Sequence, residues 1–149
     1  MSPPGDRDLP DLPAMDRFGA AIAARLRAGD AVTLSGELGT GKTTLARAII
    51  AALGHTGEVP SPSYTLIETY PQLRPPIVHA DFYRLDDPAE AAELGLDDYR
   101  EGAALLAEWA ERAGGFAHEE GCLAIALEAR GTGRRAIVRG GAAWQGRMP

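Results

Sequence analysis

A glycine-rich loop between a predicted strand and a predicted helix constrains this chain more than any other feature. The loop reads Gly36-Glu37-Leu38-Gly39-Thr40-Gly41-Lys42-Thr43 and fits the pattern G-x-x-x-x-G-K-[ST]. Residues 31–35 before it form a short apolar strand, and residues 43–53 after it carry apolar side chains at helical spacing up to Gly54. Strand, loop and helix in this order are typical of a phosphate-binding loop, or P-loop, in an α/β protein.

Lys42 is the only lysine among the 15 lysine and arginine residues of the chain. Its ammonium is a compact charge on a flexible stem, which can reach over a tight loop to the β- and γ-phosphates of a nucleotide. The backbone N–H groups of residues 39–43 and the positive end of the following helix would bind the same phosphates. The hydroxyl of Thr43 would bind Mg²⁺. The sequence therefore predicts a nucleotide-binding protein.

The composition fits one soluble domain of 149 residues with a formal net charge of -6. This charge would repel a polyanion over most of the surface, which argues against tight binding of nucleic acid by the protein alone. Residues 1–13 do not resemble a secretory signal, and no apolar stretch approaches the ~20 residues of a membrane span, so we expect a cytosolic protein. Cys122 lies in an apolar run and is expected to be a buried thiol.

The rest of the chain alternates between helical and strand-like patterns, after a loose lead-in over residues 1–12. The last two strands are joined by Arg130-Gly131-Thr132-Gly133 and are expected to form an antiparallel hairpin. The pattern predicts a single α/β P-loop NTPase domain over residues 1–149, with a mixed, mostly parallel sheet, flanking helices and antiparallel edges. We expect helices at residues 14–28, 86–94 and 97–101, a β-rich run at 64–70, and strands at 76–81, 104–107, 122–127 and 135–138.

Two carboxylates follow apolar runs that are typical of strands. Asp81 comes after Ile77-Val78-His79-Ala80, and Glu108 comes after Leu105-Leu106-Ala107. An open α/β sheet presents its ligand site at the carboxyl ends of its strands, and Mg²⁺ needs a carboxylate besides a hydroxyl and the phosphates. Both acids are therefore candidates for the catalytic site. His79 is expected to be a packed or hydrogen-bonded strand residue rather than a catalytic base.

Thr65 and the turn Ser61-Pro62-Ser63 precede one of the predicted strands. A hydroxyl in this segment would contact the γ-phosphate and move on hydrolysis, as the switch loops of GTPases do. A hairpin or edge strand that uses threonine for its β propensity explains the segment equally well. The residues alone favour neither interpretation.

Four blocks of the sequence together resemble the TsaE (YjeE) family. The P-loop block is shared by many NTPases, whereas the second and third blocks are much more specific. The blocks occur in the family's order and with compatible spacing, over about residues 14–139. They are Gly36-Glu37-Leu38-Gly39-Thr40-Gly41-Lys42-Thr43-Thr44, Ser61-Pro62-Ser63-Tyr64-Thr65-Leu66, His79-Ala80-Asp81-Phe82-Tyr83-Arg84-Leu85 and Glu108-Trp109.

The resemblance implies a small bacterial ATPase that supports synthesis of threonylcarbamoyladenosine at position 37 of tRNA. It also implies ATP and Mg²⁺ as cofactors and the proteins TsaB and TsaD as partners. In this family TsaD carries out the transfer, so tRNA would be contacted mainly through the complex. Carried over to this chain, the phosphates would be bound by Gly39, Thr40, Gly41, Lys42, Thr43 and Thr44, and the metal by Thr43 and Glu108. Asp81 would hold the Walker-B-like position, Thr65 the switch-like loop, and Trp109 would pack beside the nucleotide.

Two other functions are compatible with a P-loop. A small-molecule kinase of similar fold would need an arginine-rich lid and a second substrate pocket, and the chain has no insertion large enough for a typical lid. A nucleotide-dependent regulator that hydrolyses little would need neither.

Four arginines, at positions 130, 134, 135 and 139, gather on the predicted C-terminal hairpin. One explanation is a solvated edge strand that its charges protect from aggregation. The other is a basic patch for tRNA or for an acidic partner surface.

Overall fold

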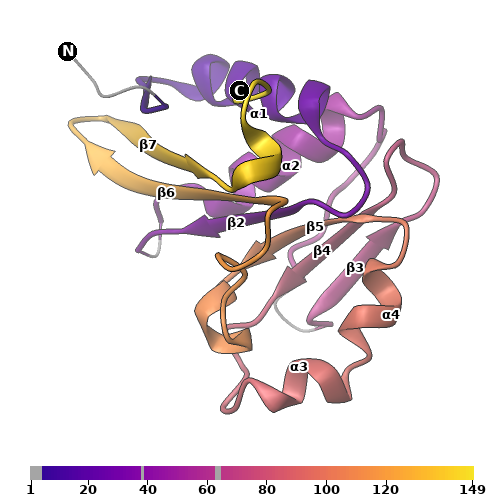
Figure 1. Ribbon diagram of the computed structural model, residues 1–149. Coiled ribbons are helices and arrows are strands. Elements are labelled where there is room, and N and C mark those ends of the chain that lie inside the picture. The colour runs from indigo at the N-terminus through magenta and orange to yellow at the C-terminus, as the bar shows by residue number, and fades with distance from the viewer. Residues whose placement is uncertain (1–4, 38, 63–64) are drawn as a thin grey trace.

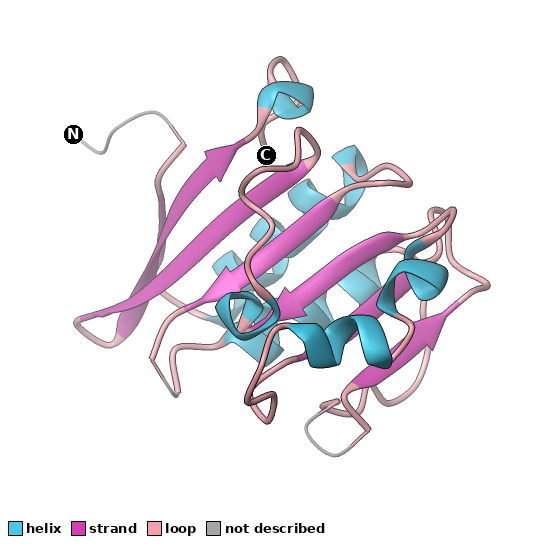
Figure 2. Cartoon of the chain, turned by 60° about the horizontal axis from the view of Figure 1, so that its bottom comes forward, coloured by secondary structure: helices cyan, strands magenta, loops and turns pink. Residues whose placement is uncertain are grey.

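The computed structural model describes residues 5–37, 39–62 and 65–149. A seven-stranded sheet runs through the molecule, with helices on both of its faces (Figures 1 and 2). The strand order is β1-β7-β6-β2-β5-β4-β3. The strands are β1 (Arg7–Leu9), β2 (Ala31–Ser35), β3 (Ile67–Tyr70), β4 (Ile77–Asp81), β5 (Ala104–Glu108), β6 (Cys122–Arg130) and β7 (Gly133–Gly140).

The centre of the sheet is parallel and its two sides are antiparallel. Strand β2 pairs in parallel with both β5 and β6, and β4 pairs in parallel with β5. Strand β3 is antiparallel to β4, and β7 is antiparallel to both β6 and β1. The predicted α/β P-loop fold with a parallel centre and an antiparallel C-terminal hairpin is therefore confirmed.

Helices α1 and α2 cover one face of the sheet, and the short helices α3 and α4 lie on the other (Figure 1). The side chains of β5 alternate between two hydrophobic cores, since Leu106 packs with the α1 and α2 side and Leu105 with the α3 and α4 side. Both are fully buried, as expected for a central parallel strand. The helices are α1 (Leu12–Arg25), α2 (Lys42–Ala52), α3 (Ala89–Glu93) and α4 (Leu96–Arg100), with 3-10 turns η1 (Ala110–Ala113) and η2 (Ala142–Trp144). Within the described part of the chain, none of these helices has the length and apolar character to span a bilayer.

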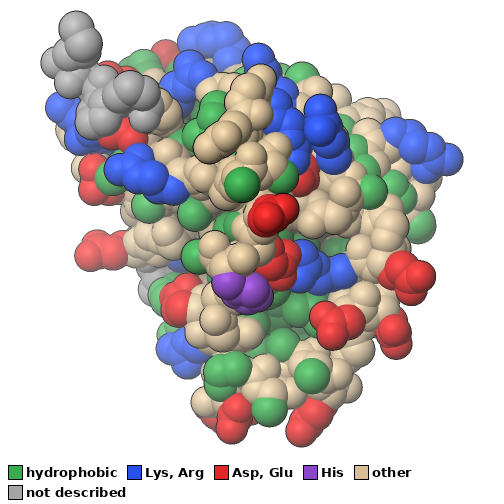
Figure 3. All heavy atoms as spheres, in the orientation of Figure 1, with side chains coloured by type: hydrophobic (Ala, Val, Ile, Leu, Met, Phe, Trp, Pro, Cys, Tyr) green, Lys and Arg blue, Asp and Glu red, His purple; other side chains and the backbone are tan. Residues whose placement is uncertain are grey.

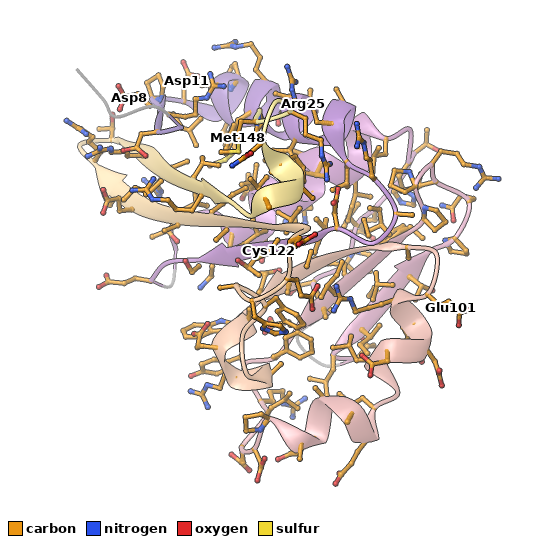
Figure 4. The ribbon with its side chains drawn as sticks, viewed as in Figure 1. Asp8, Asp11, Arg25, Glu101, Cys122 and Met148 are labelled. Carbon is orange, nitrogen blue, oxygen red and sulfur yellow. The ribbon has the colours of Figure 1, made fainter. Side chains whose placement is uncertain are left out.

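The N-terminal segment is more ordered than its sequence indicates. The prediction of a loose lead-in over residues 1–12 is wrong for Arg7–Leu9, which form β1, while residues 1–4 lie outside the described residues. Leu9 is buried in the core, and the backbone of β1 pairs with the edge of β7. Helix α1 also begins earlier than predicted, because Asp11 caps it by accepting a 2.9 Å hydrogen bond from the Ala14 N–H (Figure 4).

The C-terminal segment closes the core beside α1. Trp144 is fully buried, and its Nε1–H donates a 2.8 Å hydrogen bond to the Gly121 oxygen. Arg147 lies over the Trp144 ring at 3.9 Å and donates to both carboxylate oxygens of Asp30. Met148 packs against the same core (Figure 4). The predicted buried thiol of Cys122 is confirmed.

Candidate functional site

The glycine-rich loop joins the end of β2 to the start of α2. Gly36 has a φ of 141°, and a Cβ at this position would lie 2.4 Å from the backbone oxygen of Leu127, so only glycine fits. Gly41, with a φ of 98°, precedes α2 and provides no side-chain cap for it. The positive end of α2 is therefore open to an anion. Leu38 of the motif lies outside the described residues.

The Lys42 ammonium lies over this loop, in a largely buried position. Its Nζ donates a 2.6 Å hydrogen bond to the Gly36 oxygen and stands 4.2 Å from the centre of the Trp109 ring. Trp109 has a left-handed backbone with a φ of 56°, which is unusual for a bulky residue and is a mark of functional sites. Its ring contacts that of Tyr83 at a centroid distance of 4.8 Å. The charge of Lys42 is thus held between a carbonyl and an aromatic face.

Glu108 ends β5 with 2% of its surface exposed and connects two other site residues. Its Oε1 accepts a 3.0 Å hydrogen bond from the Thr43 hydroxyl at the start of α2. Its Oε2 lies 2.8 Å from Nε2 of His79, which is fully buried on β4. Because an ionised carboxylate only accepts hydrogen bonds, the histidine proton is assigned to Nε2. His79 is hydrogen-bonded within a strand, as predicted, but its pairing with a candidate metal ligand had no signal in the sequence.

Asp81 ends β4 and lies directly beside Glu108 in the parallel register. Burial is the main cause that raises the pKa of the Asp81 carboxyl, and the charge of Glu108 raises it further. The hydrogen bond from the Tyr83 backbone N–H to Oδ1, at 3.0 Å, opposes this effect and lowers the pKa, as do the charges of His79 and Lys42. The net result is a carboxyl group that holds its proton more tightly than an exposed aspartate does.

The sequence-predicted site residues converge on one cleft of about 330 Å³, with two exceptions, Thr40 and Thr65. Thr40 lines a neighbouring cleft instead. Thr65 is exposed, and its hydroxyl donates a 3.0 Å hydrogen bond to Glu68 instead of facing the cleft. Ser61 of the same segment does line the cleft, whereas Ser63 and Tyr64 lie outside the described residues. The switch-like role of Thr65 stays a prediction. The cleft is lined by Gly39, Gly41, Lys42, Thr43, Thr44, Ser61, Asp81, Glu108 and Trp109.

A second cleft of about 420 Å³ adjoins the first one across the glycine loop. The two share Gly39, Gly41 and Thr44, so both are bordered by the glycine loop and the start of α2. The second cleft is largely built by β1, the start of α1 and the tip of the β6–β7 hairpin. Its other lining residues are Leu9, Pro10, Asp11, Leu12, Met15, Thr40, Thr132, Gly133 and Arg134.

The hairpin arginines are engaged within the chain. Arg135 and Arg139 both contact the buried carboxylate of Asp6, at 2.7 and 3.4 Å. Arg130 is 3.9 Å from Asp8, and Arg134 donates hydrogen bonds to the glycine loop. Lys and Arg side chains nevertheless dominate the upper part of the view in Figure 3, over α1 and the C-terminal segment, while Asp and Glu dominate around α3 and α4.

The oxygen donors of the cleft fit a magnesium ion that a nucleotide helps to hold. Mg²⁺ in nucleotide sites takes one or two protein ligands and completes its shell with phosphates and waters. The Thr43 hydroxyl and the Glu108 carboxylate, 3.0 Å apart, supply such a pair beside the open end of α2. Among the described residues, no three His, Cys, Asp or Glu side chains converge as a metal site of their own.

The fold and the glycine loop define a P-loop protein of the α/β class. A profile described as threonylcarbamoyl adenosine biosynthesis protein TsaE matches residues 9–137. The chain therefore belongs to the TsaE family, as its sequence blocks indicate. The matched region begins at the last residue of β1 and ends within β7, so it includes the five strands between them and all the residues that line the two clefts.

Individual relatives agree with this assignment. The tRNA threonylcarbamoyladenosine biosynthesis protein TsaE of Haemophilus influenzae is 42% identical over 117 residues, which are 74% of each chain. The protein of the same name from Streptomyces coelicolor is 44% identical over 65% of this chain and 68% of its own. The crystal structure of YdiB from Bacillus subtilis superposes with a TM-score of 0.75 at 28% identity, covering 94% of this chain and 88% of that one.

The raised pKa of Asp81 predicts how its replacement affects stability at different pH. A carboxyl group whose pKa is raised on folding favours the folded state below its unfolded pKa, and this contribution is lost as the pH rises through the folded pKa. Asp81→Asn keeps an acceptor for the Tyr83 N–H but has no charge to bury. We therefore expect it to increase the free energy of unfolding at about pH 8, with a gain that shrinks toward about pH 4. Urea unfolding of both proteins across this range measures the effect, and a gain independent of pH would contradict it.

Proposed function

We propose that this protein is a Mg²⁺-dependent ATPase that acts in the threonylcarbamoyladenosine modification of tRNA at position 37. The observation that carries the proposal is the 3.0 Å hydrogen bond from Thr43 to Glu108. It joins the Thr43 hydroxyl at the start of α2 to the Glu108 carboxylate at the end of β5, and both residues line the cleft beside the glycine loop. This is the arrangement that a nucleotide-bound Mg²⁺ requires of a P-loop protein.

The triphosphate lies along the glycine loop in this proposal. Backbone N–H groups within residues 39–44, other than that of Thr40, bind its oxygens, and the Lys42 ammonium leaves the Gly36 carbonyl to contact the β- and γ-phosphates. Thr43 and Glu108, which are hydrogen-bonded to each other in this structure, would hold the metal. Bound Mg²⁺ would neutralise charge that develops on the phosphate oxygens. The nucleoside end occupies the second cleft, which shares Gly39, Gly41 and Thr44 with the first one.

Hydrolysis transfers the γ-phosphoryl group to water and releases ADP and phosphate. The oxygen of the water forms a bond to the γ-phosphorus while the bond to the bridging oxygen of ADP breaks. Asp81, next to Glu108 on the neighbouring strand, is positioned to hold a water molecule at the metal side of the cleft. Thr65 would contact the γ-phosphate only after its segment moves, because its hydroxyl is bound to Glu68.

The partners in this proposal are TsaB and TsaD, and the site of action is the cytoplasm. Lys42 is the only cationic side chain among the described residues that line the phosphate cleft. A second cation, often an arginine from a partner, is worth about 10³–10⁵ in rate in other P-loop enzymes. The proposal is therefore that the isolated protein binds ATP well and hydrolyses it slowly until partners complete the site. tRNA contacts are made mainly through the complex, in line with the net charge of -6.

Replacement of Lys42 tests nucleotide binding. Lys42→Ala removes a charged donor worth about 1.5–3 kcal/mol, so we expect the affinity for a non-hydrolysable ATP analogue to fall about 10- to 100-fold. Lys42→Arg should not restore binding, because a wide planar guanidinium does not replace the compact ammonium that reaches over the tight loop to the phosphates. Isothermal titration calorimetry measures both. Wild-type affinity in Lys42→Ala would refute the P-loop assignment.

Replacement of the two carboxylates tests the metal site. Glu108→Gln keeps the size of the side chain but removes the charged ligand, so it should raise the Mg²⁺ concentration needed for half-maximal ATP hydrolysis. Asp81→Asn should raise it less, because Asp81 acts through water. The Mg²⁺ dependence of analogue binding provides a second measurement that does not rely on turnover. A larger metal defect in Asp81→Asn would reverse the two roles.

The dependence on partners separates the proposed ATPase from the other two functions. We expect the rate of phosphate release by the isolated protein to rise when purified TsaB and TsaD are both added. A rate for the isolated protein equal to that of the mixture would favour a self-sufficient enzyme such as a kinase. Tight nucleotide binding with no phosphate release under either condition would favour a non-hydrolysing regulator.

A further inference from the structure

Arg134 differs from the other hairpin arginines because it contacts the phosphate loop. Its Nη2 donates a 2.9 Å hydrogen bond to the Gly39 oxygen and its Nε a 3.1 Å hydrogen bond to the Thr40 oxygen. Its Nη1 donates to the oxygen of Gly133, at 2.8 Å. One planar guanidinium therefore ties two successive carbonyls of the loop to the start of β7, which follows them by more than 90 residues.

The strand that carries Arg134 is held firmly in place. Arg134 is opposite Leu9 of β1 on one side and opposite Ala129 of β6 on the other. At the preceding position, a Cβ on Gly133 would lie 2.6 Å from Pro10 Cα and 2.7 Å from the Leu9 oxygen, so the two backbones are in close contact. Arg134 thus extends from a paired strand in the sheet, and its side chain is only partly exposed.

The two hydrogen bonds determine which way the loop N–H groups point. In a planar trans peptide the carbonyl and the N–H of the next residue point in opposite directions. With the Gly39 and Thr40 oxygens held toward Arg134, the N–H groups of Thr40 and Gly41 point away from it. The Thr40 N–H closes the loop on the Glu37 oxygen at 3.3 Å. The Gly41 N–H remains directed away from Arg134, at the residue that precedes α2 and lines both clefts.

We propose that Arg134 is a positioning residue that presets the phosphate loop for nucleotide, through the loop carbonyls and not through its charge alone. The inference rests on the proposed nucleotide binding. It assigns a role to the one hairpin arginine that does not pair with an acid in the described structure. Lysine cannot replace it, because a single ammonium lacks the planar fork that reaches two adjacent carbonyls from a fixed direction.

The test compares Arg134→Gln, Arg134→Lys and, as a matched control, Arg130→Gln. Arg130 lies in the same hairpin, but its side chain is 59% exposed and its guanidinium lies 3.9 Å from Asp8. Titration calorimetry with ADP should show affinity about tenfold lower in both Arg134 variants and unchanged in Arg130→Gln. Wild-type affinity in Arg134→Lys would overturn the inference, since charge would then be sufficient.

Hydrogen–deuterium exchange of the nucleotide-free proteins tests the same inference without a ligand. Amides of residues 39–44 should exchange faster in both Arg134 variants than in the wild type or Arg130→Gln, at an unchanged melting temperature. Equal exchange in all four proteins would overturn the inference. If wild-type protein failed to bind ADP, the proposed function would be wrong, while the exchange comparison would still decide the role of Arg134.

Discussion

The parallel register of β2, β5 and β4 determines where the candidate site lies. Leu34 on β2 is opposite Glu108 on β5, and Glu108 is opposite Asp81 on β4. Three strands thus end at the same edge of the sheet, and the glycine loop begins at Gly36, directly after β2. A shift of one residue in either pairing would turn a carboxylate away from the cleft. The buried apolar side chains of these strands prevent such a shift, so the core fixes the site.

Two acidic side chains lie at this edge of the sheet, and hydrogen-bond donors of the same chain stabilise them. Glu108 and Asp81 are both largely buried and adjacent, which is costly unless opposite charges and donors surround them. Thr43 and His79 donate to Glu108, and the Tyr83 backbone donates to Asp81. These contacts hold two carboxylates close together in a region where water alone does not stabilise them. Buried ionisable groups whose pKa values are shifted by burial and by neighbouring charges, as that of Asp81 is, cluster at functional sites.

Much of the fold and the core of the site could be predicted from the sequence, because the relevant signals are local. The P-loop spacing identified Lys42 and Thr43, and apolar runs ending in acids identified Asp81 and Glu108. The contacts that the sequence did not reveal join residues that are far apart in the chain. Strand β1 has three residues, two of them charged, so its pattern has too little periodicity to reveal a partner in β7. Arg134 appeared as one of four surface arginines, since nothing near it in the sequence indicates the loop that it contacts.

Each of the two tryptophan rings has a cation beside it, but only one of the rings lines a cleft. Trp144 is fully enclosed by the core, whereas Trp109 lines the phosphate cleft beside the Lys42 ammonium. Indole emission depends on the polarity and charge around the ring, so the two residues respond to different events. Trp144 reports the integrity of the core, and Trp109 reports what happens next to the lysine. The chain therefore contains two native optical probes, and a single Trp→Phe replacement at either position isolates the signal of the other.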